Sequence, residues 1–318
     1  MIEGYSGVRA AVLGASGFIG QWVARKLNEA SAEVGLIVRD RSRLSDLKGQ
    51  VFEIDLAHPD EVGKIFELFR PAITFNLAGY GVDPAERDNN LSEKLNAQLP
   101  RVICDAAAGW KDPQWPSQHI VQVGSALEYG TVSGDLREDG PVKPTTVYGQ
   151  SKLRGTQNVT EGCRRLGLRG LTARLFTVYG PGEHNTRLLP SLIRGAQSGQ
   201  RLELTAGTQQ RDFAYVEDVA EGLLRLGLSA TAPGLVVNLA TGELHSVREF
   251  IEIAASILGI PGSKLRFGGL PTRAEEMQHD PVSVETMKTI TGFVPPSSIK
   301  LGVERTLAQL RVGVVPRI

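Results

Sequence analysis

Tyr148 and Lys152 form a YxxxK unit within the segment YGQSK at 148–152. Residues four apart lie on one face of a helix, so the phenol and the ammonium group would be neighbours. A phenol with a pKa of about 10 exchanges protons poorly at pH 7, and a nearby cation lowers that pKa by stabilising the phenolate. The pair is therefore a candidate acid/base for an oxygen of a bound substrate. YxxxK also occurs by chance, and a structural tyrosine beside a solvated lysine is the alternative interpretation.

Ser125 is a further candidate because it follows the predicted strand at 119–123. A hydroxyl at the end of that strand could hydrogen-bond the same substrate oxygen as Tyr148. We therefore predict Ser125, Tyr148 and Lys152 as the catalytic residues. Without the other two, Ser125 would be an ordinary turn residue at a strand end.

A glycine-rich turn, GASGFIG at 14–20, follows the first predicted strand and opens the first predicted helix. Glycine lets the backbone approach a pyrophosphate closely, and the helix N-terminus supplies free N–H groups and partial positive charge. The spacing is GxxGxxG rather than GxGxxG, and three glycines are often only a turn. The position after the first strand nevertheless predicts a dinucleotide site. Its predicted contacts are Gly14, Ser16, Gly17, Phe18, Ile19 and Gly20.

Arg39 stands at the end of the second predicted strand, nineteen residues beyond Gly20. An acidic residue directly at that strand end would accept hydrogen bonds from the adenosine ribose of NAD, whereas arginine favours the 2′-phosphate of NADP. We predict NADP as the cofactor, with NAD as the alternative. A solvated basic loop, or a contact from Asp40 to the ribose, would also explain the pattern.

Two further strand ends are placed to line the same dinucleotide. Asp55 and Leu56 follow the third predicted strand and are predicted to meet the adenine. Leu77, Ala78 and Gly79 follow the fourth strand and are predicted to line the nicotinamide side. Each segment by itself could equally be a plain turn.

Short apolar runs alternate with helical patterns through the first half of the chain. The predicted strands lie at 8–13, 34–38, 51–54, 72–77, 119–123 and 171–175, and the predicted helices at 19–27, 60–69 and 91–108, with Pro100 as a candidate kink in the last. This alternation predicts an α/β fold, a doubly wound parallel sheet of the Rossmann type with a smaller C-terminal substrate lobe.

The same pattern predicts how the chain divides. We expect residues 1–180 to form the dinucleotide-binding domain and 209–240 to return to it, with a late strand at 236–239. Residues 181–318 are expected to form mainly the discontinuous substrate-binding lobe, with helices at 188–198 and 247–258.

The composition disfavours several classes of protein. The 318 residues include 35 Lys+Arg and 35 Asp+Glu, so the net charge is +0 and favours neither a nucleic acid nor a membrane as partner. No stretch approaches the ~20 apolar residues that span a bilayer, and no secretion signal is recognised, so we expect a cytoplasmic location. Cys104 and Cys163 are expected to be small buried residues. The scattered histidines show no metal-ligand spacing, and we expect no metal.

Several motifs occur in order over nearly the whole chain. They are GASGFIG at 14–20, Asp55-Leu56, NLAG at 76–79, Asn96, GSALEYG at 124–130, YGQSK at 148–152, ARLFTVYGPG at 173–182, RDFAYVEDV at 211–219 and NLATGE at 238–243. In these motifs the chain resembles the extended short-chain dehydrogenases, in the NAD(P)-dependent sugar epimerase/dehydratase branch. The combination is specific for the family and much less specific for the substrate.

The resemblance implies a role for each matched position. Tyr148 would be the acid/base, Lys152 its modulator and a ligand of the cofactor ribose, and Ser125 the partner on the reacting oxygen. Asn96 would be a cofactor-site residue that supports the active site.

The resemblance also implies a nucleotide-sugar substrate, held by the region after Pro181. Arg211, which opens RDFAYVEDV, would pair with the diphosphate, and Arg273 would be a second diphosphate ligand. Thr177 stands where many members have the asparagine that contacts the sugar nucleotide. Members commonly dimerise through the helix of Asn96 and the helix of the YxxxK unit, so a homodimer is expected.

Departures from the family pattern narrow the reaction. The dehydratases carry Asp-Glu directly after the catalytic Ser/Thr, where this chain has Ala126-Leu127, which cannot do acid/base work. A 4,6-dehydratase is therefore disfavoured, and so is a UDP-glucuronate decarboxylase. The leading hypothesis is an NADP(H)-dependent reductase of a nucleotide-diphosphate-linked 4-keto(-6-deoxy) sugar. The alternatives are a 4-epimerase with tightly bound NAD, a reductase of flavonoid or steroid-like ketones, and a non-catalytic NADP-binding protein.

Overall fold

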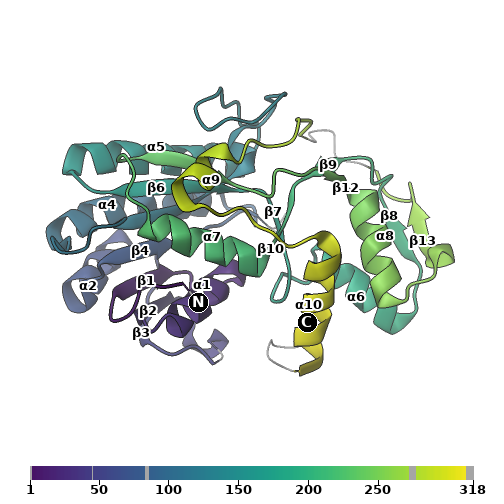
Figure 1. The fold of residues 1–318 in the computed structure, drawn as a ribbon, viewed down its shortest axis with the longest axis horizontal. Coiled ribbons are helices and arrows are strands. Elements are labelled where there is room, and N and C mark those ends of the chain that lie inside the picture. The colour runs from purple at the N-terminus through teal and green to yellow at the C-terminus, as the bar shows by residue number, and fades with distance from the viewer. Residues whose placement is uncertain (1, 45, 83–85, 272–276, 313–318) are drawn as a thin grey trace.

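The computed structural model describes residues 2–44, 46–82, 86–271 and 277–312 (Figure 1). A seven-stranded sheet forms its centre, with the strand order β11-β6-β5-β4-β1-β2-β3. Every pairing in this sheet is parallel. The strands are β1 (Arg9–Leu13), β2 (Glu33–Val38), β3 (Gln50–Glu53), β4 (Ile73–Asn76), β5 (Ile120–Ser125), β6 (Gly170–Leu175) and β11 (Leu235–Leu239). The predicted doubly wound sheet is confirmed, and the late strand predicted at 236–239 is β11, which pairs with β6.

Helices cover both faces of the sheet, so its inner strands β1, β4, β5 and β6 are mostly buried on both sides. On one face α1 (Phe18–Glu29) packs against α7 (Val216–Leu228). On the other face α4 (Leu99–Trp110) packs against both α2 (Pro59–Phe69) and α5 (Val147–Leu166).

Strand β1 shows how one segment contributes to two cores. Ala10 and Val12 belong to the core on the α1 and α7 side, whereas Ala11 and Leu13 belong to the core on the α2 and α4 side. Successive side chains of a strand point to opposite faces, which is why a continuous apolar run suits this position.

The helix predicted at 91–108 is instead three consecutive segments. These are α3 (Asn89–Ser92), a π-helical turn (Glu93–Gln98) and α4, in whose first turn Pro100 lies. Proline has no N–H to bond the carbonyl of residue i−4, which is Asn96, and its ring crowds that carbonyl. The wider π-helical turn accommodates this defect before α4 begins. Pro100 therefore marks the start of a regular helix and not a kink within one.

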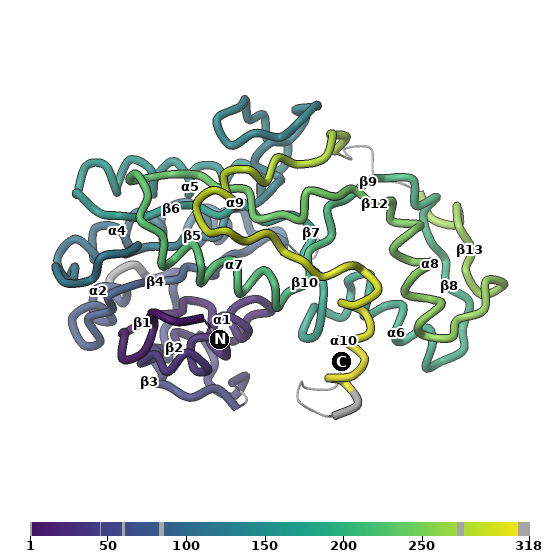
Figure 2. The backbone as a smooth tube through the Cα atoms, viewed as in Figure 1, coloured from purple at the N-terminus to yellow at the C-terminus, as the bar shows by residue number. Residues whose placement is uncertain are grey.

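The C-terminal part adds short strand pairs and more helices. The strand pairs within its described residues are β7 (Thr177–Tyr179) with β10 (Phe213–Tyr215), β9 (Gln210–Arg211) with β12 (His245–Ser246), and β8 (Leu202–Leu204) with β13 (Leu265–Phe267). The helices are α6 (Leu188–Ser198), α8 (Val247–Leu258), α9 (Glu285–Thr291) and α10 (Ile299–Val312). Figure 2 shows α6, α8, β8 and β13 gathered at the end of the molecule away from β1, β2 and β3.

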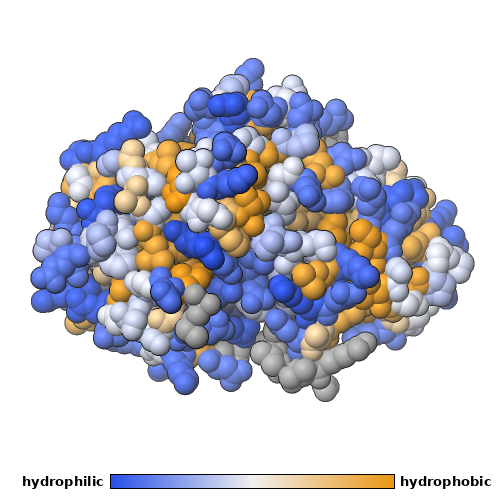
Figure 3. All heavy atoms as spheres, viewed as in Figure 1, coloured by the Kyte–Doolittle hydropathy of each residue, from blue (hydrophilic) through white to orange (hydrophobic). Residues whose placement is uncertain are grey.

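Hydrophilic and hydrophobic residues are interspersed on the face shown in Figure 3. Within the described part of the chain, no helix combines the length and apolar character needed to cross a bilayer.

Candidate active site

The glycine turn lies at the carboxyl end of β1 and forms a compact cradle. Gly14 has φ +78°, and a Cβ there would lie 3.1 Å from the backbone nitrogen of Ala78. A Cβ on Gly20 would lie 2.1 Å from the carbonyl oxygen of Gly14, so only glycine fits where the turn meets α1. Gly17 is the N-cap of α1 and provides no capping side chain, and no acidic residue lies in the first turn. The N–H groups of that turn are therefore suited to an anion, which fits the pyrophosphate of a dinucleotide.

The residues predicted to meet the adenosine end lie at the ends of β2 and β3. Arg39 is exposed. The neighbouring Asp40 carboxylate accepts hydrogen bonds from Ser42 N at 2.9 Å and Ser42 Oγ at 2.6 Å, and these bonds lower the pKa of Asp40. Asp55 is exposed and accepts from Ala57 N at 3.0 Å. One oxygen of the Asp40 carboxylate, Oδ1, is thus bonded within its own turn, next to the exposed Arg39.

Asn96 is fully buried, at 0% exposure, and all its side-chain bonds are to the protein. Its Nδ2 donates to the carbonyl oxygen of Tyr80 at 2.7 Å and to Ser151 Oγ at 2.9 Å, and its Oδ1 accepts from Tyr80 N at 3.0 Å. Ser151 Oγ in turn donates to the carbonyl oxygen of Tyr148. Asn96 therefore joins the loop after β4 to the first turn of α5. The role predicted for Asn96 in supporting the active site stays a prediction, and in this structure its amide bonds Tyr80 and Ser151.

The three predicted catalytic side chains come together where β5 and α5 meet. Ser125 ends β5, and Tyr148 and Lys152 lie on consecutive turns of α5. The Ser125 hydroxyl hydrogen-bonds that of Tyr148. The approach is close, since a Cβ on Gly149 would lie 2.4 Å from the carbonyl oxygen of Leu127. Gly149 thus allows the first turn of α5 to rest on the turn that follows Ser125.

The electrostatic surroundings decide the resting protonation of the pair. Burial raises the pKa of Tyr148, and the hydrogen bond from Ser125 opposes that rise by stabilising the phenolate. Burial lowers the pKa of Lys152 to about 8, and the negative charge of Glu128 opposes that shift. Lys152 Nζ donates to the carbonyl oxygen of Val123. These shifts leave the phenol protonated and the ammonium group mostly charged at pH 7, an arrangement that could deliver a proton from Tyr148.

Glu128 is a residue of this site that the sequence interpretation missed. It is 0% exposed, and its Oε1 accepts from Ser125 N at 2.8 Å. Its Oε2 accepts from Thr156 Oγ1 at 3.0 Å and from Arg174 Nε at 2.9 Å. The sequence contains a pattern that could have identified Glu128, because Ser125 and Glu128 have the S-x-x-E spacing of a capping box. That capping box is formed in the structure. Arg174 also lies over the ring of Tyr129, with Cζ 4.5 Å from its centroid.

The predicted substrate residues lie on the short strands beyond β6. Thr177 N donates to the carbonyl oxygen of Asp212 at 3.0 Å, which fixes β7 beside the segment that begins at Arg211. The Asp212 carboxylate accepts from the backbone N–H groups of Thr241 and Gly242. Arg273 lies outside the described residues.

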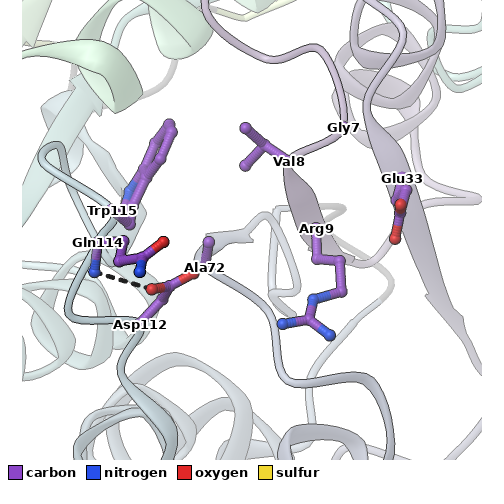
Figure 4. Close-up of a pocket in the computed structure, with 8 residues that line it drawn as sticks. All are labelled: Gly7, Val8, Arg9, Glu33, Ala72, Asp112, Gln114 and Trp115. Carbon is purple, nitrogen blue, oxygen red and sulfur yellow. Dashed lines mark hydrogen bonds between the residues drawn. The ribbon is translucent and has the colours of Figure 1, made fainter.

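A hollow of about 300 Å³ lies at the amino edge of the sheet, opposite the glycine turn. Figure 4 shows it between Val8 and Arg9 of the chain entering β1, Glu33 of β2 and the loop of Asp112 and Trp115. None of the predicted site residues lines it. In open parallel sheets, ligands bind at the carboxyl ends of the strands, where the catalytic side chains are found. Among the described residues, no group of three or more His, Cys, Asp or Glu side chains is arranged to hold a metal ion.

The comparison with known protein families identifies the family of this chain. The family model described as "NAD dependent epimerase/dehydratase family" matches residues 10–240. The chain belongs to this family. The matched residues include the glycine turn, the YxxxK unit and most of the seven-stranded sheet up to β11, its last strand along the chain.

Two curated relatives match this chain over nearly their full length. It is 26% identical over 304 residues to a dTDP-6-deoxy-L-talose 4-dehydrogenase (NAD(P)(+)) of Kitasatospora kifunensis, covering 92% of each chain. It is 28% identical over 313 residues to a GDP-6-deoxy-D-mannose reductase of Pseudomonas aeruginosa, covering 94% of this chain and 96% of the relative. The structure of MoeE5 with UDP-glucuronic acid and NAD has a TM-score of 0.81 at 24% identity, covering 97% of this chain and 100% of that one, and shows the shared fold.

Proposed function

We propose that this protein is an NADP(H)-dependent reductase of a nucleotide-diphosphate-linked 4-keto(-6-deoxy) sugar. The observation that carries the proposal is the convergence of Ser125, Tyr148 and Lys152 at the same carboxyl edge of the sheet as the glycine turn, with no carboxylate at Ala126 or Leu127. Such a site can move a proton to a carbonyl oxygen but lacks the side chains for eliminating water.

The chain's own residues supply the proton and orient the substrate. Tyr148 donates its proton to the keto oxygen of the sugar, and the Ser125 hydroxyl donates a hydrogen bond to the same oxygen. The buried ammonium of Lys152 stabilises the negative charge that forms on Tyr148. A bound dihydronicotinamide would supply the hydride that the keto carbon needs.

Several features support the cofactor and the substrate class. The glycine cradle suits a pyrophosphate, and the exposed guanidinium of Arg39 suits a 2′-phosphate. Leu127 is 39% exposed beside Ser125, an apolar neighbour that suits a methyl group better than a hydroxyl. Arg211, with Thr177 nearby, is proposed to meet the diphosphate. The two curated relatives, named for a 6-deoxy-talose and a 6-deoxy-mannose nucleotide, support the same substrate class.

The proposed reduction is tested by the stoichiometry of NADPH consumption. We expect the purified protein to consume one NADPH for each 4-keto-6-deoxy sugar nucleotide reduced, with dTDP- and GDP-linked substrates tried in parallel. Tyr148→Phe should retain NADPH binding and lose turnover.

The competing functions give different results in the same assay. Isomerisation with no net consumption of NADPH, together with NAD released from the denatured protein, would establish a 4-epimerase instead. Dinucleotide binding without turnover of any sugar nucleotide would indicate a non-catalytic protein.

A further inference from the structure

A buried ion pair lies directly beneath the catalytic side chains. Glu128 and Arg174 face each other at 2.9 Å, with side-chain exposures of 0% and 4%. Arg174 belongs to β6 and Glu128 to the turn after β5, so the pair joins two neighbouring strands at the carboxyl edge of the sheet. A buried pair of this kind adds little net stability, because desolvation offsets most of the attraction. Its position beneath the site calls for another explanation.

The Glu128 carboxylate contacts both elements that carry the catalytic side chains. Oε1 accepts from the backbone N–H of Ser125, on the β5 side. Oε2 accepts from Thr156 Oγ1, one helical turn beyond Lys152 on α5. The same side chain thus fixes Ser125 and sets its distance from α5.

Few charged residues of the described chain act on the catalytic groups Tyr148 and Lys152. Glu128 is the charged residue that acts on Lys152 and raises its pKa. Glu128 also raises the pKa of Tyr148, as does Glu86 from the loop after β4, whereas Arg187 at the start of α6 lowers it. The charge on Glu128 therefore acts in the same direction on both catalytic groups.

We propose that Glu128 is the positioning residue of the acid/base site: it orients Ser125 through the backbone and holds a buried negative charge between β5 and α5, near Tyr148 and Lys152. This inference rests on the proposed function, since protonated groups are what a reductase needs to deliver a proton. Glu128 itself touches neither the substrate nor the cofactor, because it is enclosed by Ser125, Thr156 and Arg174.

The direct test follows the titration of Lys152 and needs no substrate. In protein labelled with ¹³C at lysine Cε, the Lys152 signal should titrate well below those of the other lysines and disappear in Lys152→Met. In Glu128→Gln its midpoint should fall by about one pH unit, the effect expected on removing a nearby opposite charge. Thr156→Val is the matched control, because it removes a hydrogen bond to the same carboxylate but leaves the charge, and its midpoint should stay that of the wild type.

A second variant keeps the test valid if Glu128→Gln fails to fold. Glu128→Gln leaves Arg174 buried without its partner, whereas the double variant Glu128→Gln/Arg174→Met removes both charges. The double variant should also titrate Lys152 at lower pH. Wild-type titration of Lys152 in both variants would overturn the proposal and leave Glu128 as a structural counter-ion of Arg174.

The kinetic readout separates this proposal from the proposed function. In the reduction assay, activity falls as Tyr148 and Lys152 lose their protons, so the alkaline limb of the kcat/KM profile should move to lower pH in Glu128→Gln. A loss of rate with an unmoved limb would contradict the positioning role. Absence of turnover in the wild type would refute the reductase alone, since the lysine titration is measured independently.

Discussion

Replacing Lys152 with methionine should stabilise the fold while removing activity. Lys152 is 4% exposed, and burial lowers its pKa from 10.5 to about 8. A depressed lysine pKa means that the folded state disfavours the charged form. Methionine has a similar length and no charge, so Lys152→Met removes that penalty.

The magnitude follows from the pKa. At about 1.4 kcal/mol per pKa unit, the difference between 10.5 and about 8 corresponds to about 3 kcal/mol at pH 7. The lost hydrogen bond offsets about 1 kcal/mol. The Val123 carbonyl is not left unpaired, because Gln122 Nε2 still donates to it at 3.0 Å. We therefore expect Lys152→Met to raise the free energy of unfolding by about 2 kcal/mol at pH 7.

The sign of the pH dependence provides the sharper check. The penalty is fully present below the folded-state pKa of about 8 and disappears as the pH approaches the unfolded value of 10.5. In urea unfolding, the advantage of Lys152→Met over the wild type should therefore shrink steadily between pH 8 and pH 10. The exposed Lys143 gives the matched control, and Lys143→Met should show no such trend. An advantage that stays constant with pH, or a destabilised Lys152→Met at pH 7, would refute the reasoning.

Three further predictions concern the cofactor and the reaction. Tyr148→Phe should lower kcat by about 10²–10⁴-fold with little change in the Kd for NADPH, as measured by steady-state kinetics and fluorescence titration. Gly20→Ala should abolish dinucleotide binding, because its Cβ would lie 2.1 Å from the carbonyl oxygen of Gly14. Gly63→Ala is its control, since a Cβ there meets nothing within 4 Å, and calorimetry should show unchanged binding with stability raised by up to about 1 kcal/mol. Arg39→Glu should reverse the preference of kcat/KM from NADPH to NADH, and an unchanged ratio would remove Arg39 from the 2′-phosphate site.

The local pattern of the sequence was sufficient for most elements of the fold. The predicted helices at 188–198 and 247–258 are α6 and α8 with the same bounds, because their apolar spacing and the glycine after each define both ends. The glycine turn and the YxxxK unit were equally readable, since each depends on residues within one or two helical turns of each other. The parallel, doubly wound sheet followed from the alternation of strands and helices, whereas the order of its strands was given by the structure.

Contacts between distant segments were decided only by the tertiary structure. Asn96 and Ser151 are 55 residues apart, and Glu128 and Arg174 are 46 apart. No periodic pattern in the sequence indicates which side chain of one segment will contact which side chain of another segment in the folded protein. Which partners the Asn96 amide bonds, and whether Glu128 is a solvated turn residue or a buried charge, depended on which groups the fold enclosed. The sequence thus determined the candidate chemistry of Tyr148 and Lys152, and packing decided their electrostatic environment, because burial and nearby charges set a pKa.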